Sequence, residues 1–187
     1  MSCILTPLLI AAIQDRLDAF NLLLELDAKP MLYEAIDYVI KRRSELRYYY
    51  THLNEDIKDS YLLTLIDHAY NDDLNKTLIR VIHHSFSDQI ILSIIRSGAN
   101  VDIEIMQVAA SSRNTSIVQY LLSCGIQPDD YVLNIFVYRS NIDIITQILN
   151  CGTKPTDKTL YILNKFSDKR TRAYKQIKQL LIEAMKN

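Results

Sequence analysis

Residues 90–98 read IILSIIRSG, residues 117–125 read IVQYLLSCG and residues 144–152 read IITQILNCG. Each stretch has large aliphatic residues at its first, second, fifth and sixth positions and a glycine at its ninth, and successive stretches are 27 residues apart. These are the only 3 glycines in the chain. Recurrence at a fixed period is typical of a repeat protein, so the sequence predicts repeated copies of one structural unit.

The spacing of the aliphatic residues predicts an amphipathic helix in each stretch. Four such side chains lie on one side of a helix, and burying each of them contributes roughly 1.5–3 kcal/mol. The glycine that follows suits the left-handed backbone in which many helices end. A second apolar segment, at 105–110 or 132–137, precedes each of the last two stretches, and polar residues separate the two segments. Each unit is therefore predicted to be a helix, a short turn, a second helix and a glycine.

The same pattern divides the whole chain into units. They run over about 4–28, 29–72, 73–99, 100–126 and 127–153, with a C-terminal cap at 154–187 whose outer face is charged, as a terminal repeat requires. The first unit has Thr6 as an N-cap, Pro7 at the first helical position and Asp27 in place of the glycine. The second unit carries an insertion at 44–56. We expect one all-α domain, a solenoid of about five helix-turn-helix units joined by short connectors.

Two segments give this pattern a family resemblance. Residues 6–12 (TPLLIAA) resemble the Thr-Pro-Leu-His-x-Ala-Ala signature of ankyrin repeats, and residues 97–102 (SGANVD) resemble the Gly-Ala-Asp/Asn stretch that ends an ankyrin unit. The step of 27 residues is shorter than the usual one of about 33. The abundance of Ile, Tyr, Asn and Lys makes the chain similar to the eroded ankyrin proteins of large DNA viruses or intracellular bacteria. That resemblance implies a host protein as the partner, and interference with host signalling, defence or turnover.

Composition excludes several broad classes of function. A chain of 187 residues, 49% of them hydrophobic, suffices for one substantial core. The net charge of −1 provides no general attraction to nucleic acid or to an anionic membrane, although residues 151–187 sum to +6 and residues 51–150 to −6. Without a basic leader or an apolar run of about 18 residues, we expect a cytoplasmic protein that does not enter membranes. The 3 cysteines indicate a reducing compartment, with Cys124 and Cys151 as free thiols.

Residue types that carry catalysis or bind metals are present, but their spacing does not fit those roles. His83 and His84 are neighbours on a helix, so their side chains point apart by about 100° and do not chelate one metal readily. The acidic pair Asp129-Asp130 falls at a turn, where capping or solvation of a helix end explains it. The glycines are isolated, which excludes a phosphate-binding glycine-rich loop. We therefore expect no enzyme, no metal and no cofactor.

The ankyrin resemblance also indicates where a partner would bind. In ankyrin-like folds the partner usually lies against the connectors and the ends of the first helices. The matching positions vary along the repeats while the core positions do not, and recognition is free to use the variable set. These candidate binding residues are Ile13, Gln14, His84, Ser85, Ser111, Ser112, Tyr138 and Arg139 at helix ends, and Ile103 and Asp130 in connectors.

Two further stretches have the composition of an interaction surface. Tyr48, Tyr49 and Tyr50 lie in the insertion beside basic residues, which is the composition of a protein-binding hot spot or of a stacking platform for single-stranded nucleic acid. They are equally explained as a cover for the side of the solenoid. The basic residues between 169 and 178 suit an acidic partner or phosphate groups, and a solvated capping face explains them as well.

The function expected from this pattern is a non-enzymatic scaffold that binds a protein partner. A nucleic-acid-binding helical repeat is the first alternative, and its binding would fall steeply with salt. A structural or self-associating subunit is the second alternative. An enzyme is the third, and it would require a deep pocket holding several acids or histidines with strongly perturbed pKa values.

Overall fold

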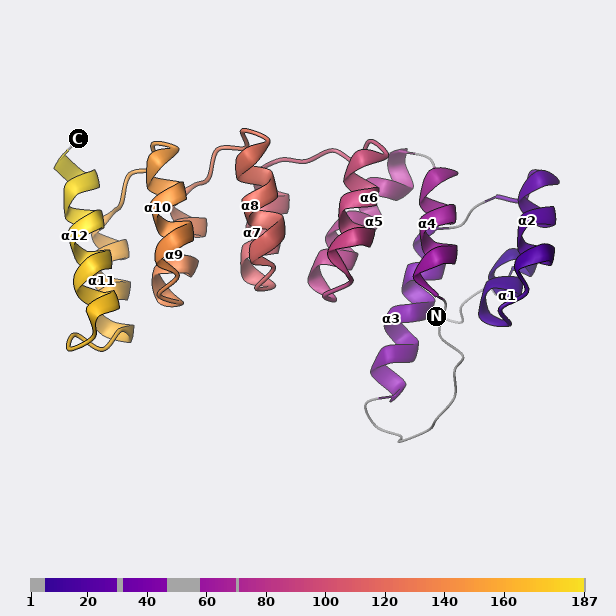
Figure 1. Ribbon diagram of the computed structural model, residues 1–187, viewed down its shortest axis with the longest axis horizontal. Helices are drawn as coiled ribbons and strands as arrows, with labels where there is room; N and C mark the ends of the chain where they lie inside the picture. The colour runs from indigo at the N-terminus through magenta and orange to yellow at the C-terminus, as the bar shows by residue number, and fades with distance from the viewer. Residues whose placement is uncertain (1–5, 30–31, 47–57, 70, 187) are drawn as a thin grey trace. The chain divides into compact units, whose positions relative to one another are not determined.

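The computed structural model describes residues 6–29, 32–46, 58–69 and 71–186. These residues form twelve helices and no strand, so the chain is all-helical (Figure 1). They divide into two compact units, 1–100 and 101–187, and the prediction of a single domain stays a prediction. In the first unit the helices are α1 (Pro7–Ile13), α2 (Leu17–Glu25), α3 (Leu32–Leu46), α4 (Asp59–Asp67), α5 (Asn71–His83) and α6 (Asp88–Arg96). In the second they are α7 (Ile103–Ser111), α8 (Thr115–Ser123), α9 (Asp130–Tyr138), α10 (Ile142–Asn150), α11 (Asp157–Phe166) and α12 (Arg172–Lys186).

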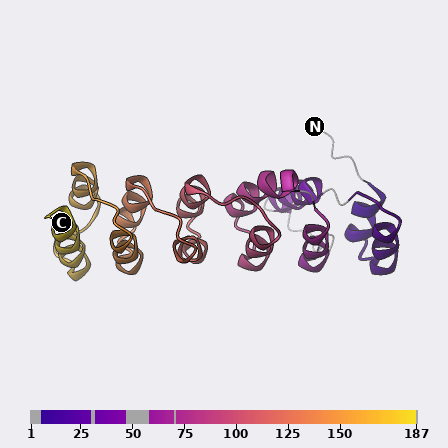
Figure 2. The ribbon, with the colours of Figure 1, turned by 90° about the horizontal axis from the view of Figure 1, so that it is seen from above.

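The second unit is a row of three helix pairs. Within it the first helices α7, α9 and α11 pack side by side, and the second helices α8, α10 and α12 do the same. The two layers are visible in Figure 2, where each pair contributes one helix to each layer. Of the four aliphatic residues in each repeated stretch, three are buried and the fourth is half-buried. Ile144, Ile145 and Ile148, for example, are at most 1% exposed. The predicted stripe therefore faces the core.

The three glycines end helices as the sequence predicts. Gly98, Gly125 and Gly152 have φ values of 104°, 83° and 90°. The amide of Gly125 donates to the carbonyl oxygen of Leu122 and the next amide donates to Leu121, at 3.0 and 3.1 Å. These two bonds are the paired closure that satisfies the last carbonyl groups of a helix.

The turns between the two helices of a pair close in the same way without glycine. Arg113 and Ser140 have φ values of 62° and 56°. The residues that follow them, Asn114 and Asn141, cap the second helices, because each side-chain oxygen accepts a hydrogen bond from the backbone amide three residues on, at 3.2 Å in both cases. Two kinds of short turn, one with glycine and one without, thus alternate along the row from α7 to α11.

The first unit also pairs its helices. Thr6 caps α1 by accepting a 3.3 Å bond from the amide of Leu9, with Pro7 at the first helical position, as predicted. Phe20 of α2 and Tyr61 of α4 pack edge to face, with ring centroids 4.9 Å apart. Helix α3 continues to Leu46, past the predicted start of the insertion, and 47–57 lie outside the described residues.

None of the helices in the described residues is both long enough and apolar enough to cross a membrane.

Candidate functional site

In the second unit, two of the helix-end residues predicted to bind a partner, Ser111 and Arg139, are in contact. Arg139 has a structural role there. Arg139, which follows α9, donates hydrogen bonds to the backbone oxygens of Ala110 and Ser111, the latter at 3.0 Å. These bonds reach the C-terminal end of α7, where the carbonyl oxygen of Ala110 also accepts from the backbone amide of Arg113 at 3.2 Å. Burial lowers the pKa of the Arg139 guanidinium, and the nearby charge of Arg113 adds to the effect. Arg139 therefore fastens the end of α9 to the end of α7.

Four exposed aromatic rings lie next to this fastening, and we call them the aromatic patch. They are Tyr131, Tyr138, Tyr161 and Phe166, with exposed fractions of 47%, 58%, 58% and 52%. Tyr131 and Tyr138 are seven residues apart on α9, which is about two turns, so they share one side of that helix. Tyr161 and Phe166 belong to α11, which packs against α9. The patch is therefore carried by two neighbouring first helices.

Specific contacts link three of the four rings, and the fourth, Tyr131, contacts Ser111. The rings of Tyr138 and Phe166 pack edge to face with centroids 5.2 Å apart. The ammonium group of Lys165 donates a 2.9 Å hydrogen bond to the Tyr161 hydroxyl and lies 5.2 Å from the centroids of both the Tyr161 and the Phe166 ring. The hydroxyl of Tyr131 lies 3.2 Å from that of Ser111. Rings that contact one another and a cation are already oriented, which lowers the entropy lost on binding.

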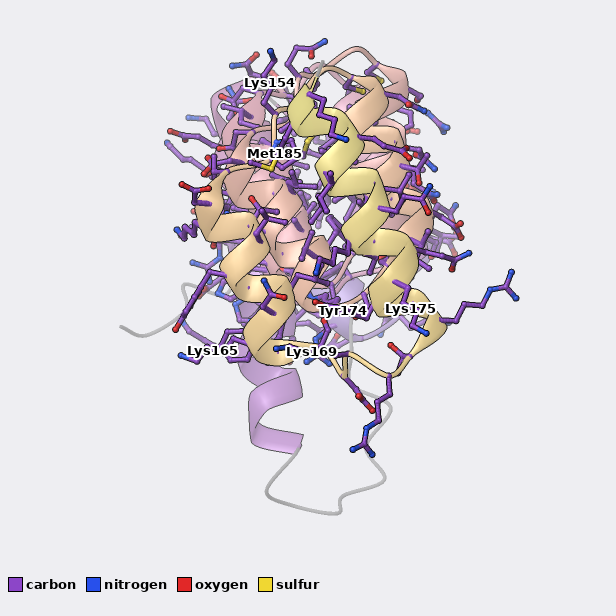
Figure 3. The ribbon with its side chains drawn as sticks, turned by 90° about the vertical axis from the view of Figure 1, so that its left-hand side faces the viewer. Lys154, Lys165, Lys169, Tyr174, Lys175 and Met185 are labelled. Carbon is purple, nitrogen blue, oxygen red and sulfur yellow. The ribbon has the colours of Figure 1, made fainter. Side chains whose placement is uncertain are left out.

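The chemistry of the patch suits recognition of a macromolecule. Large aromatic side chains with a polar tip combine apolar contact area with a hydrogen-bonding group, and they are enriched among the residues that dominate binding energy. Lys165, which is labelled in Figure 3, adds positive charge beside the rings of Tyr161 and Phe166. Among the described residues, no group of three or more His, Cys, Asp and Glu side chains could hold a metal ion.

Sequence reasoning missed most of this patch. Of its four rings only Tyr138 was among the candidate binding residues. The seven-residue spacing of Tyr131 and Tyr138 was the available signal for a shared exposed side of one helix. For Phe166 the sequence offers no such signal. An apolar residue at the end of a helix is normally predicted to be buried, and only its neighbours in the fold show whether it is exposed.

The remaining candidates occupy the places that the repeat assigned to them. Ile13 is the last residue of α1 and Gln14 follows it, while His84 and Ser85 follow α5. Gln14, His84 and Ser85 are exposed and Ile13 is half-buried. Burial, followed by the charge of His83, lowers the pKa of His84. These residues belong to the first unit and remain candidates.

The connector candidates lie at the opposite helix termini. Ile103 and Asp130 are the first residues of α7 and α9, whereas Ser111 and Tyr138 are the last residues of the same helices. Asp130 is exposed in the first turn of α9, where a negative charge is favourable to the helix dipole. Ser112, next to Ser111, is half-buried. Tyr48, Tyr49 and Tyr50 lie outside the described residues.

The structure also reveals a column of polar residues that the sequence reading did not identify. In the second unit, Gln107, Asn134 and Tyr161 follow one another at intervals of 27 residues on α7, α9 and α11. Within the second unit, the Gln107 amide donates a 2.7 Å hydrogen bond to the carboxylate of Asp129, which also caps α9. Asn134 is 6% exposed and its side-chain amide has no hydrogen-bond partner. Gln107 therefore joins the adjacent first helices α7 and α9, whereas the buried, unpaired side-chain amide of Asn134 costs free energy of folding.

The thiols and acidic residues are accounted for locally. Cys124 is exposed, Cys151 is half-buried, and both are free. Asp129 accepts a hydrogen bond from the amide of Val132 at 2.9 Å, so the capping role predicted for this acidic pair is confirmed for its first member. Comparison of the chain with models of protein families, with curated proteins and with solved structures returns no match.

Proposed function

We propose that this chain is an ankyrin-like helical-repeat protein that binds another protein through the aromatic patch and performs no catalysis. The observation that carries the proposal is the exposure of four aromatic rings, each close to half or more, on the adjacent helices α9 and α11. Large exposed apolar patches mark interaction sites. The patch contacts the helix-end positions that ankyrin-like proteins use for their partners.

Several local features support the ankyrin-like part of the proposal. Thr6 and Pro7 start α1 with the cap that the signature requires. Gly98, Gly125 and Gly152 close the second helices at the repeat period. In the second unit, first helices pack on first helices and second helices on second helices. A row of helix pairs buries its aliphatic stripes only by stacking neighbours, which creates an extended surface suited to binding.

The chemistry of the patch restricts the partner. The ammonium group of Lys165 lies against two of its rings. A partner that fills the patch would combine an apolar or aromatic anchor with carboxylate groups. The anchor would displace water from the rings, and the carboxylates would pair with Lys165.

The test removes the rings without touching the fastening at Arg139. We expect Tyr138→Ala combined with Phe166→Ala to weaken partner binding by roughly tenfold or more, because both rings have the character of hot-spot residues. Ile79→Ala is the matched control, since Ile79 is 41% exposed on α5 in the first unit. Proteins captured from the native cell type by the wild type and by each variant are quantified by mass spectrometry, with circular dichroism as the check on folding. Equal capture by a folded double variant would contradict the proposal.

A single-stranded nucleic acid is the alternative partner that the same observation favours. Exposed aromatic rings beside a lysine also form stacking platforms for bases. The two proposals differ in salt dependence, because neutralising phosphates releases counterions and makes affinity fall steeply with ionic strength. Binding of a labelled single-stranded oligonucleotide that weakens steeply with salt, and that is lost in the double variant, would replace the protein partner with a nucleic acid.

A further inference from the structure

An exposed leucine pair on α2 distinguishes the first helix pair from the others. Leu22 is 54% exposed, and Leu26, which directly follows α2, is 70% exposed. The repeat places Ser93 and Ser97 at the equivalent positions of α6, Tyr120 and Cys124 at those of α8, and Gln147 and Cys151 at those of α10. None of these three helix pairs has two aliphatic residues where the first pair has Leu22 and Leu26. Two leucines four residues apart lie on one side of a helix and form an apolar ridge. Exposure of this ridge to water is unfavourable in free energy.

Acidic residues border this ridge. Asp18 and Glu25 are exposed on α2, four residues before Leu22 and three residues after it. These spacings place both carboxylates beside the leucines on the same side of the helix. The α2 ridge, which we define as Leu22, Leu26, Asp18 and Glu25, is therefore apolar at its centre and negative along one edge.

Helix α12 carries the complementary surface. A groove lies along it, with Ile182 and the ring of Tyr174 in its wall and Lys175, Lys178 and Lys186 beside them. Ile182 is 37% exposed, and Figure 3 shows Tyr174 and Lys175 near the start of this helix. Glu183 is the one acidic residue in the lining of the groove. The α12 groove, which we define by these residues, is apolar in part and predominantly positive.

We propose that the α2 ridge of one copy of this chain docks in the α12 groove of a second copy. The leucine pair covers Ile182, the exposed apolar residue of the groove, while Asp18 and Glu25 approach Lys175 and Lys178. Pairing two α2 ridges in antiparallel fashion would bring the two acidic edges together, and pairing two α12 grooves would bring lysines together. Charge complementarity therefore selects the contact between unlike surfaces. This inference goes beyond the proposed function and does not use the aromatic patch.

A contact between two different surfaces has a specific consequence for assembly. Each copy retains one unused α2 ridge or α12 groove after pairing, so the assembly grows into a chain of copies or closes into a ring. The average mass in solution should rise with protein concentration. It should fall when salt is added, because the acidic and basic borders are exposed and are screened.

The experiment inactivates each surface separately and then mixes the products. Leu26→Asp inactivates the ridge, and Lys175→Glu with Lys178→Glu inactivates the groove. We expect each variant alone to have a dissociation constant raised by roughly tenfold or more, as for central interface residues. An equimolar mixture should form a heterodimer and nothing larger, because one variant keeps an intact groove and the other an intact ridge. Leu17→Asp is the matched control, since Leu17 is 56% exposed and lies about two and a half turns from Leu26.

Sedimentation velocity of the full-length chain distinguishes the outcomes, with circular dichroism as the check on folding. Concentration-dependent association of the wild type and of Leu17→Asp, its loss in both inactivating variants and its recovery as a heterodimer in the mixture would support the proposal. A wild type that stays monomeric up to roughly millimolar concentration would overturn it. A groove variant that still dimerises by itself would overturn it too, since that result indicates a contact between two ridges.

Discussion

The two kinds of turn in this repeat carry the same hydrogen bonds and have different amino acids. Turns inside a helix pair have Asp15, Ser85, Arg113 or Ser140 at the residue of positive φ. In the turns that leave a pair, the equivalent residue is glycine at Gly98, Gly125 and Gly152. Both kinds close with paired bonds from two successive amides to carbonyl groups of the preceding helix, as at Asn114 to Ala109 and at Ile126 to Leu121. Hydrogen bonding therefore does not explain where the glycines are.

The backbone angle explains it. The turns inside a pair have φ values between 55° and 62°, which lie in the left-handed region that residues with a Cβ can occupy. The glycine turns have φ values between 83° and 104°, beyond that region. Asp27 supports this explanation. Its turn leaves a helix pair, as the glycine turns do, but its φ is 64°, and the residue there is not glycine. A turn requires glycine when its φ exceeds the left-handed basin, whichever helices it joins.

The largest effect on this comparison is expected from Gly125→Ala. A Cβ added at Gly125 would meet no atom within 4 Å, so the cost is one of backbone conformation and not of packing. We expect a loss of about 1–2 kcal/mol in the free energy of unfolding. Chemical denaturation measures it, and Gly125→Asn should lose less because asparagine tolerates positive φ. An alanine variant as stable as the wild type would show that the angle does not select glycine.

A smaller effect is expected from the opposite substitution, Ser140→Gly. Since serine already occupies an accessible angle of 56°, removing its Cβ relieves little strain, and the freer unfolded chain offsets that relief. We expect the free energy of unfolding to change by roughly 0.5 kcal/mol or less. The same denaturation assay applies. A stabilisation comparable with the loss in Gly125→Ala would mean that the turns inside pairs are strained as well.

The smallest effect concerns the side chain of one such turn residue, Asp15. Hydrogen bonds from Lys58 and then from Tyr61 hold the pKa of its carboxyl below the ordinary value of 3.8. The stabilisation is therefore present above 3.8 and is lost as the pH falls through the lower pKa of the folded chain. Asp15→Asn keeps a residue that tolerates positive φ. Unfolding at neutral pH should show the wild type slightly more stable, and the difference should vanish in strong acid.

The helix pairs could be predicted because their signals are local. The aliphatic spacing of 90–98 and its two repetitions depends only on which side of one helix is apolar, and the structure buries Ile90, Ile91 and Ile94 completely. Thr6 and Asp129 were identifiable as caps, because a cap interacts with amides two or three residues away in the same chain. The sequence predicted the turns inside the pairs from their polar residues. It did not predict which residue of each turn has a positive φ, because serine and arginine have no marked preference for that conformation.

The candidate site was predicted less completely because exposure depends on neighbours. Tyr138 and Ser111 were found by position in the repeat, and the structure brings Tyr131 and Phe166 to them from outside the predicted set. Arg139 was expected to face a partner, and its guanidinium instead donates to the end of α7. The carbonyl groups that accept from it belong to residues 28 and 29 positions earlier, in another helix pair.

The amino-acid sequence by itself determined the 27-residue period, the helix pairs and the glycine stops, because each of these follows from the periodicity of one helix and from the angles that one residue can adopt. The tertiary structure alone decided that Phe166 is exposed, that Arg139 is engaged and that Leu22 and Leu26 remain uncovered. Those outcomes depend on which helix packs against which. The residue spacing within one repeat does not encode its contacts with the neighbouring repeats.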